Sequence, residues 1–234
     1  MKNVTLEEKT ADISADLSVE SLALNAIDVF KNAQCKKAPF KHWLFSNVLP
    51  AAICNEIIAL PIAPVPVIDT YGKRDSHNEI RKFFSPEMQE QYPVMRVVAE
   101  TFQRPEVARA IEEMCGVELE GSYLRIEYCQ DRNGFWLEPH MDIPEKFITM
   151  QVYLNTGLMA ETLGTDLYDS EKQHVGSAPS QLGEAMLFVP KEPESWHGFE
   201  GRAIPDVRRS LIINYVTDDW RSRHELSFPD KRVS

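Results

Sequence analysis

The feature that most constrains the fold of this 234-residue chain is a change in its hydrophobic pattern at Gly116. Before Gly116, apolar residues recur mostly at helical spacing, most clearly over residues 86–115. After it, short runs of β-branched and aromatic residues alternate with clusters of Gly, Pro, Asn and Asp, which are typical of strands and turns. The sequence therefore predicts helices followed by a β-rich half.

Three helical segments are predicted in the first half. A short amphipathic helix is expected over residues 21–31, and a second helix follows Pro50, because proline is favoured where a helix begins. The third segment, residues 86–115, contains Pro93 and Pro105, which interrupt a helix. We expect four main strands in the second half, over residues 124–128, 147–154, 185–189 and 211–216.

Three other segments lack a helical or strand pattern. Residues 1–20 are polar and are predicted to form a loose N-terminal extension without the apolar core of a signal peptide. Residues 61–69 contain three prolines and predict an extended connector, and residues 72–84 predict a charged surface loop.

Composition and charge limit the class of function. Hydrophobic residues make up 43% and charged residues 26%, which excludes a disordered, collagen-like or coiled-coil chain. The net charge of −11 disfavours binding to nucleic acid or to an anionic membrane. The four cysteines form no CxxC metal motif, and no apolar run reaches the ~18 residues of a membrane span. These features predict a cytoplasmic protein with reduced thiols.

The most informative motif is His140-Met141-Asp142, followed 57 residues later by His197. Residues two apart on an extended chain point to the same face, so His140 and Asp142 can hold one ion together. A second histidine from a neighbouring strand would complete two nitrogens and one carboxylate, the ligand set of non-haem Fe(II) oxygenases. The alternative is a chance triplet in which both histidines are ordinary core or surface residues.

The context of the motif favours a metal site. His140 comes just before the predicted strand FITMQVYL, and His197 follows the apolar run AMLFVP. Arg208 opens the predicted strand LIINYV. This arrangement resembles the Fe(II)/2-oxoglutarate-dependent dioxygenases, in particular their prolyl-hydroxylase-like branch. The resemblance covers residues 122–216 and rests on these motifs in family order: His140-x-Asp142, Tyr153-Leu154-Asn155, His197 and Arg208-x-Ser210.

The resemblance implies a mainly β fold with N-terminal helices, a double-stranded β-helix (a jelly-roll, cupin-like barrel) braced by those helices. A single dioxygenase domain is expected over residues 21–234. It would comprise helical support over about 21–116, the β-helix over about 117–217 and a tail over 218–234, for which no role is predicted.

The resemblance also implies a role for each matching residue. His140, Asp142 and His197 would bind Fe(II). Arg208 would pair with the far carboxylate of the cosubstrate 2-oxoglutarate, because a guanidinium grips a carboxylate bidentately. Arg208 is preferred to the adjacent Arg209 for this role.

Three more residues are predicted to support the cosubstrate. Ser210 shares the face of Arg208 in the family's R-x-S pattern. Tyr153 matches a family tyrosine whose hydroxyl reaches the same carboxylate, and Tyr128, one strand before the metal motif, is a weaker candidate. For both tyrosines the alternative is an ordinary strand aromatic. Lys146 and Thr149 also lie near the motif, but a chance placement is the preferred interpretation of each.

The implied reaction uses O₂ and 2-oxoglutarate, releases succinate and CO₂, and hydroxylates an unactivated C–H bond. Asp142 favours hydroxylation over halogenation, since halogenating relatives carry a small residue there; desaturation, epoxidation and ring formation stay open as alternatives. The predicted substrate is a small metabolite, such as an amino acid, a natural-product intermediate or a sugar derivative. The alternatives are a prolyl-type hydroxylase of protein side chains and a non-catalytic metal- or sugar-binding barrel. Monomer and homodimer both remain open.

Two segments are candidates for substrate contact. Residues 156–181 are rich in turns and are expected to cover the mouth of the site. The second is the loop over residues 74–84, which either binds an anionic group or is a solvated charged loop. It carries four basic side chains: Arg74, His77, Arg81 and Lys82.

Overall fold

The computed structural model describes residues 18–65, 72–73, 81–190 and 194–234. Most of the predicted N-terminal extension lies outside the described residues, as do Arg74 and His77 of the basic loop.

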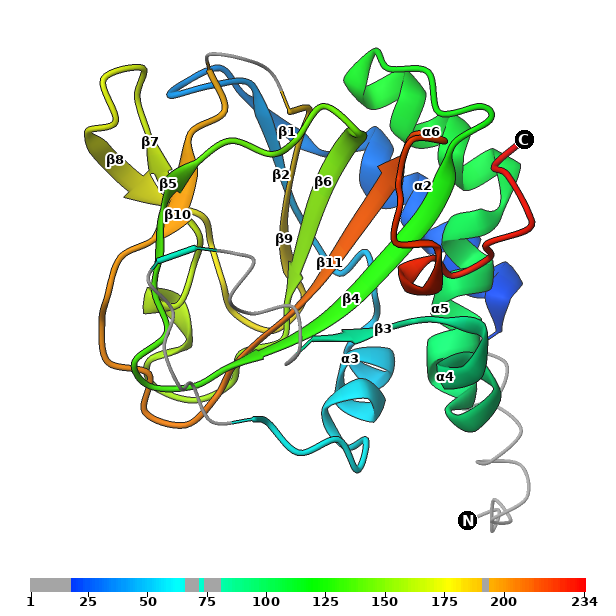
Figure 1. The fold of residues 1–234 in the computed structure, drawn as a ribbon, viewed down its shortest axis with the longest axis horizontal. Helices are drawn as coiled ribbons and strands as arrows, with labels where there is room; N and C mark the ends of the chain where they lie inside the picture. Colours follow the sequence, from blue (N-terminus) through cyan, green and yellow to red (C-terminus); the bar gives the residue numbers. More distant parts are fainter. Residues whose placement is uncertain (1–17, 66–71, 74–80, 191–193) are drawn as a thin grey trace, which may run out of the picture.

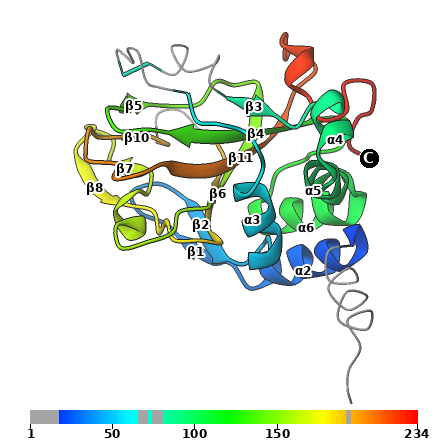
Figure 2. The same ribbon diagram turned by 90° about the horizontal axis from the view of Figure 1, so that it is seen from below.

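Eleven strands of the described chain form two antiparallel sheets that face each other (Figures 1 and 2). The larger sheet has the order β1 (Gln34–Lys36), β2 (His42–Ser46), β9 (Glu184–Phe188), β6 (Lys146–Tyr153), β11 (Arg208–Val216), β4 (Tyr123–Asp131) and β3 (Lys82–Phe83). The smaller sheet has the order β5 (Leu137–His140), β10 (His197–Phe199), β7 (Asp166–Tyr168) and β8 (His174–Ser177). Among the described residues no strand of one sheet pairs with the other, so the predicted jelly-roll is an open pair of sheets rather than a closed barrel.

In the described part of the chain, five helices cover the outer face of the larger sheet (Figure 1). They are α2 (Val19–Lys31), α3 (Ala51–Ile58), α4 (Pro86–Gln91), α5 (Pro93–Gln103) and α6 (Pro105–Cys115). The predicted helical segment 86–115 is divided because Tyr92 and Arg104, which precede its two internal prolines, are extended. Gly116 ends α6 with a φ of +75°, a conformation that glycine adopts without strain. Within the described ranges no helix combines the length and the hydrophobicity that crossing a bilayer requires.

The central strands β4, β6 and β11 have one apolar and one polar face. The apolar face packs against the helices in the main core, with contributions from Ile126, Met150 and Ile213. The polar face points toward the smaller sheet, yet its side chains are also buried. They include Arg125, Glu127, Asp131, Thr149, Gln151, Arg208, Ser210 and Asn214. Because buried polar groups are stable only when they are paired, this inner face must carry a connected set of hydrogen bonds.

Two sequence predictions about loops need correction. Residues 156–181 supply a short 3₁₀ helix, η2 (Ala160–Thr162), and the strands β7 and β8, so part of this segment belongs to the smaller sheet. The end of the predicted surface loop 72–84 is also buried, since Arg81 and Phe84 lie in the interior and β3 pairs with β4. The strands of the smaller sheet have only three or four residues, too few to show a clear alternation.

The C-terminal segment folds back onto the larger sheet. Leu226 pairs with Arg125 of β4, and the Ser227 amide donates to the Leu124 carbonyl at 2.9 Å. The Val233 amide donates to the Ser122 carbonyl at 2.8 Å. A second 3₁₀ helix, η3 (Arg223–Glu225), lies just before this contact and brings the segment next to the inner face of β4.

The contact between the helical layer and the sheet can be tested at Tyr215. Its buried hydroxyl donates to the carbonyl of Phe102 in α5 at 2.6 Å. Tyr215→Phe leaves this carbonyl without its donor, so we expect a loss of about 1–3 kcal/mol in the free energy of unfolding, measured by urea denaturation. Tyr92→Phe removes a less buried hydroxyl and should change stability by less than about 0.5 kcal/mol. Equal effects at the two positions would contradict this role of Tyr215.

Candidate active site

Three potential metal ligands meet at the edge of the smaller sheet. His140 ends β5, His197 begins β10, and the two residues are directly paired across these strands. Asp142 follows two residues after His140, and one ligand atom from each of the three side chains lies within 4.8 Å of the others. The Nε2 atom of His197 is 4.0 Å from Oδ2 of Asp142. The structure thus brings together the three predicted ligands.

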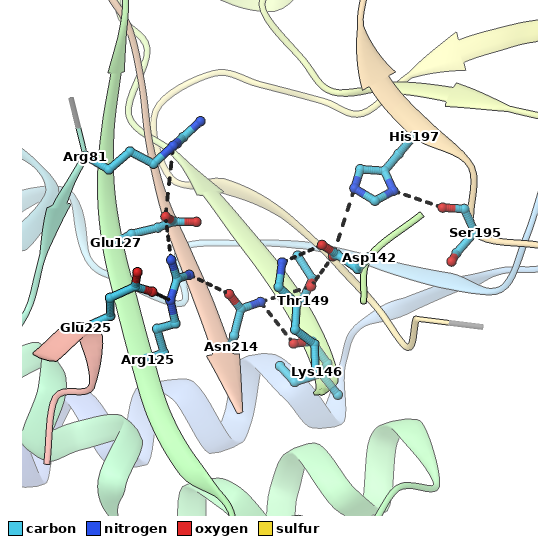
Figure 3. A network of polar contacts seen from close by, with 11 residues as sticks. Arg81, Arg125, Glu127, Asp142, Lys146, Thr149, Ser195, His197, Asn214 and Glu225 are labelled. Carbon is cyan, nitrogen blue, oxygen red and sulfur yellow. Dashed lines mark hydrogen bonds and ion pairs between the residues drawn. The ribbon is translucent and has the colours of Figure 1, made fainter. Parts of the chain in front are cut away.

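Both histidines are held in the tautomer that a metal requires. The Nδ1 atom of His140 is 2.9 Å from the Glu138 carbonyl, and that of His197 is 2.9 Å from the Ser195 carbonyl. Because a carbonyl only accepts, each Nδ1 carries the proton and donates it, which leaves a lone pair on Nε2 (His197 in Figure 3). Such a second hydrogen bond is usual for histidines that bind metals.

The third ligand, Asp142, is oriented by two side chains of β6. Lys146 donates to its Oδ1 atom, and the Thr149 hydroxyl donates to its Oδ2 atom at 2.6 Å. Thr149 in turn accepts a hydrogen bond from the Asn214 amide at 2.9 Å. Figure 3 shows that these contacts continue from the metal-ligand cluster into the inner face of the larger sheet.

The network continues to the buried guanidinium of Arg125. This group donates to Asn214 at 3.2 Å, to Glu127 at 3.1 Å and to Glu225 at 2.6 Å (Figure 3). The ring centres of Phe83 and Trp220 each lie 4.8 Å from the guanidinium carbon of Arg125. The C-terminal segment, for which the sequence predicted no role, therefore anchors the arginine that connects to the candidate metal site.

The donor set fits a divalent metal ion. Two imidazole nitrogens and one carboxylate on one side leave positions open for other ligands, as in the facial triads of non-haem iron proteins. Metal–ligand bonds near 2.1 Å separate donor atoms by about 3–4 Å, so the three side chains are already close to ligand spacing. The Asp142 side chain is only 4% exposed, and its two oxygens are fixed by Lys146 and Thr149, so little reorganisation is required.

A small, partly enclosed cavity of about 50 Å³ (the enclosed cavity) adjoins the three ligands. Its wall includes the buried Arg208, whose guanidinium donates to Asp131 at 2.6 Å and to the Leu163 carbonyl at 2.8 Å. The Phe199 ring lies 4.5 Å from the same guanidinium. These contacts fix the plane of the arginine, and the remaining wall mixes polar side chains with apolar ones, which include Phe135, Phe188 and Phe199.

The predicted cosubstrate residues Tyr153 and Ser210 lie behind this wall. Both hydrogen-bond Gln151, which lines the cavity. The Tyr153 hydroxyl donates to the side-chain oxygen of Gln151 at 3.3 Å, and the side-chain amide of Gln151 donates to the Ser210 hydroxyl at 3.1 Å. Burial raises the pKa of Tyr153, so its hydroxyl stays protonated. Arg209 points away, toward Asp206 at 3.6 Å. Direct contact of Tyr153 and Ser210 with a cosubstrate stays a prediction.

The structure places Tyr128 on the opposite face of β4. Tyr128 pairs with Leu211, and both belong to the main core under the helices. The alternation of Leu124, Ile126 and Tyr128 with charged residues already indicates a shared apolar face. The prediction that Tyr128 lines the cosubstrate pocket is therefore corrected.

Several site residues were missed or undervalued from sequence. Lys146 and Thr149 were interpreted as chance neighbours, yet they orient Asp142. Gln151 and Thr165 line the enclosed cavity and hydrogen-bond each other. The alternation of polar residues with Ile148, Met150 and Val152 on β6 was the available signal for Thr149 and Gln151, whereas no signal marked Thr165.

A second cavity, of about 580 Å³ and open to solvent, lies on the other side of His140 and Asp142. One wall is formed by Met141, Ile143 and Lys146, and the other by residues 219–222 and Glu225. The two cavities thus share two of the three candidate metal ligands.

Comparisons with known proteins identify the fold. No protein-family model and no curated protein matches this sequence. Solved structures of prolyl hydroxylases do match. A prolyl 4-hydroxylase from Phytophthora capsici has 15% identity and a TM-score of 0.57 over 87% of this chain, which spans 66% of that protein. One from Pseudomonas putida has 14% identity and a TM-score of 0.51 over 84% of this chain and 93% of its own.

A third match is a prolyl hydroxylase from Trichoplax adhaerens, in complex with a peptide fragment of the oxygen degradation domain of hypoxia inducible factor. It has 12% identity and a TM-score of 0.52 over 93% of this chain and 95% of its own. These similarities show that the chain has the fold of the prolyl hydroxylases, so the predicted fold class is confirmed.

The role of Thr149 in orienting Asp142 gives a prediction about metal binding. Thr149→Val keeps the shape of the side chain but removes the donor to Oδ2. We expect the affinity for Mn(II), a redox-stable probe of the site, to fall about 10- to 100-fold by calorimetry. Thr156→Val, at an exposed position, is the control and should bind Mn(II) as the wild type does. Unchanged affinity in Thr149→Val would show that this hydrogen bond does not position the ligand.

Proposed function

We propose that this protein is an Fe(II)- and 2-oxoglutarate-dependent oxygenase that hydroxylates an unactivated C–H bond. The observation that carries the proposal is the placement of His140, Asp142 and His197 beside an enclosed cavity that contains the guanidinium of Arg208. A metal triad alone suits many reactions, whereas a triad next to a buried carboxylate receptor suits a metal that works with a 2-oxo acid.

In this proposal the three ligands hold Fe(II), which with bound 2-oxoglutarate and O₂ supplies the oxidising chemistry and releases succinate and CO₂. Arg208 holds the far carboxylate of 2-oxoglutarate, and Asp131 with the Phe199 ring keeps its fork oriented. The rings of Phe135, Phe188 and Phe199 in the cavity wall lower the local dielectric constant, which strengthens the charged contacts next to them.

The open cavity is the proposed substrate site. Its volume of about 580 Å³ lies in the range of small-molecule sites, which supports a small metabolite such as an amino acid, a natural-product intermediate or a sugar derivative. Its wall from the C-terminal segment mixes Trp220 with charged groups, so it offers an apolar surface with polar contacts.

A second candidate function is the hydroxylation of a protein side chain. The peptide bound in the Trichoplax adhaerens structure supports it, because that protein shares this fold. The open cavity also reaches the surface, as a peptide substrate requires. Succinate release with free amino acids and sugar derivatives, compared with proline-containing peptides, distinguishes the two candidates. Release with neither set, despite cosubstrate binding, would leave the third alternative, a non-catalytic barrel.

The proposed cofactors predict a spectroscopic signature. Anaerobic addition of Fe(II) and 2-oxoglutarate to the metal-free protein should give a weak visible charge-transfer band that requires both. His197→Ala removes a ligand and should abolish the band. Arg208→Ala removes the carboxylate receptor and should raise the 2-oxoglutarate concentration needed by about 10-fold or more.

The control is Arg132→Ala, since Arg132 follows β4 on the surface and should titrate as the wild type does. Absence of the band in a folded wild-type protein would overturn the proposed function. A band that survives in His197→Ala would show that the metal is bound elsewhere.

A further inference from the structure

The enclosed cavity is lined by a second buried arginine besides Arg208. Arg81 lines the cavity together with Arg208 and the metal ligands. It precedes β3 in the chain, and its side chain is only 4% exposed. A guanidinium stays charged under all ordinary conditions, so the cavity carries two permanent positive charges.

The protein pairs these two arginines unequally. Arg208 is 2.6 Å from the carboxylate of Asp131. Among the described residues, Arg81 approaches its nearest carboxylate partner, Glu127, only to 4.0 Å, and Glu127 is 3.1 Å from Arg125 (Figure 3). Arg81 also donates to the Cys129 sulfur, but among the described residues its Nε has no hydrogen-bond partner. A buried cation with such weak partners is destabilising unless an anion joins it.

The position of Arg81 along β4 indicates which anion it meets. The inner face of β4 presents, in order, Arg125, Glu127, Cys129 and Asp131. Arg125 belongs to the network that reaches Asp142, and Asp131 holds Arg208. Arg81 contacts Glu127 and Cys129, so it lies between the metal end of the cavity and the receptor for the far carboxylate.

We infer that Arg81 is a second anchor for the cosubstrate and binds the carboxylate next to its keto group, while Arg208 binds the far carboxylate. This inference rests on the proposed function. A small enclosed cavity with two guanidiniums, beside a divalent metal site, suits one dianion rather than two separate ligands. The substrate then occupies the open cavity on the other side of His140 and Asp142.

Two 2-oxo acids separate the roles of the arginines. 2-Oxoglutarate has both carboxylates, whereas 2-oxopentanoate has the same chain length and lacks the far one. Dissociation constants are measured anaerobically with Fe(II) from the charge-transfer band. Arg81→Ala should weaken the binding of both compounds by a similar factor, about 10- to 100-fold, because the carboxylate next to the keto group is common to them. Arg208→Ala should weaken the binding of 2-oxoglutarate and leave that of 2-oxopentanoate unchanged.

Further variants control for folding and charge. Arg81→Lys keeps the charge but loses the planar fork, so its affinities should lie between those of the wild type and Arg81→Ala. Arg132→Ala should not change them. Mn(II) affinity, measured for each variant, should stay at the wild-type value and shows that the metal site is intact.

Two results would overturn the inference, and a third would overturn the proposed function on which it rests. Dissociation constants within twofold of the wild type in Arg81→Ala would show that Arg81 does not contact the cosubstrate, and would leave the substrate as its ligand. Loss of affinity for 2-oxoglutarate alone would assign Arg81 to the far carboxylate. A wild-type protein that binds neither 2-oxo acid would instead overturn the proposed function itself.

Discussion

The arrangement of the site depends on the burial of the Arg125 guanidinium between the sheet and the C-terminal segment. Its donors reach Glu127 on the same strand, Asn214 on β11 and Glu225 in η3. Because a buried charge must be paired, these three contacts fix the register of β4 against β11 and the return of the C-terminal segment. Asn214 in turn donates a hydrogen bond to Thr149, and Thr149 donates one to the candidate ligand Asp142.

One face of the larger sheet forms the core, and the other face carries residues of the candidate site. The apolar face meets the helices and forms most of the core, for example through Ile126 and Ile213. The polar face is buried as well, but its stability depends on pairing rather than on hydrophobic contact. Arg81 is where that pairing is weakest among the charges at the enclosed cavity, which is why we assign it a ligand.

The sequence predicted a helical half, a β-rich half and the candidate ligands because these follow from local patterns, whereas the jelly-roll was implied by the family resemblance. Helical spacing before Gly116, strand runs after it and the His140-x-Asp142 motif are each visible within a few residues. The interior of the site was less predictable, because alternation shows that a strand has two faces but not which face meets solvent. Arg81 was therefore interpreted within a surface loop, although β3 places it inside. Tyr128 was assigned to the pocket, although its apolar neighbours on β4 place it under the helices.

The candidate site joins two sheets that share no strand pairing in the described chain. His140 and His197 come from the smaller sheet, whereas Arg208 belongs to the larger sheet and Arg81 directly precedes its edge strand. A metal and a dicarboxylate held by both sets of residues add contacts across the gap between the sheets. Because a ligand that binds only the folded state stabilises it by linkage, occupation of this site also holds the jelly-roll together.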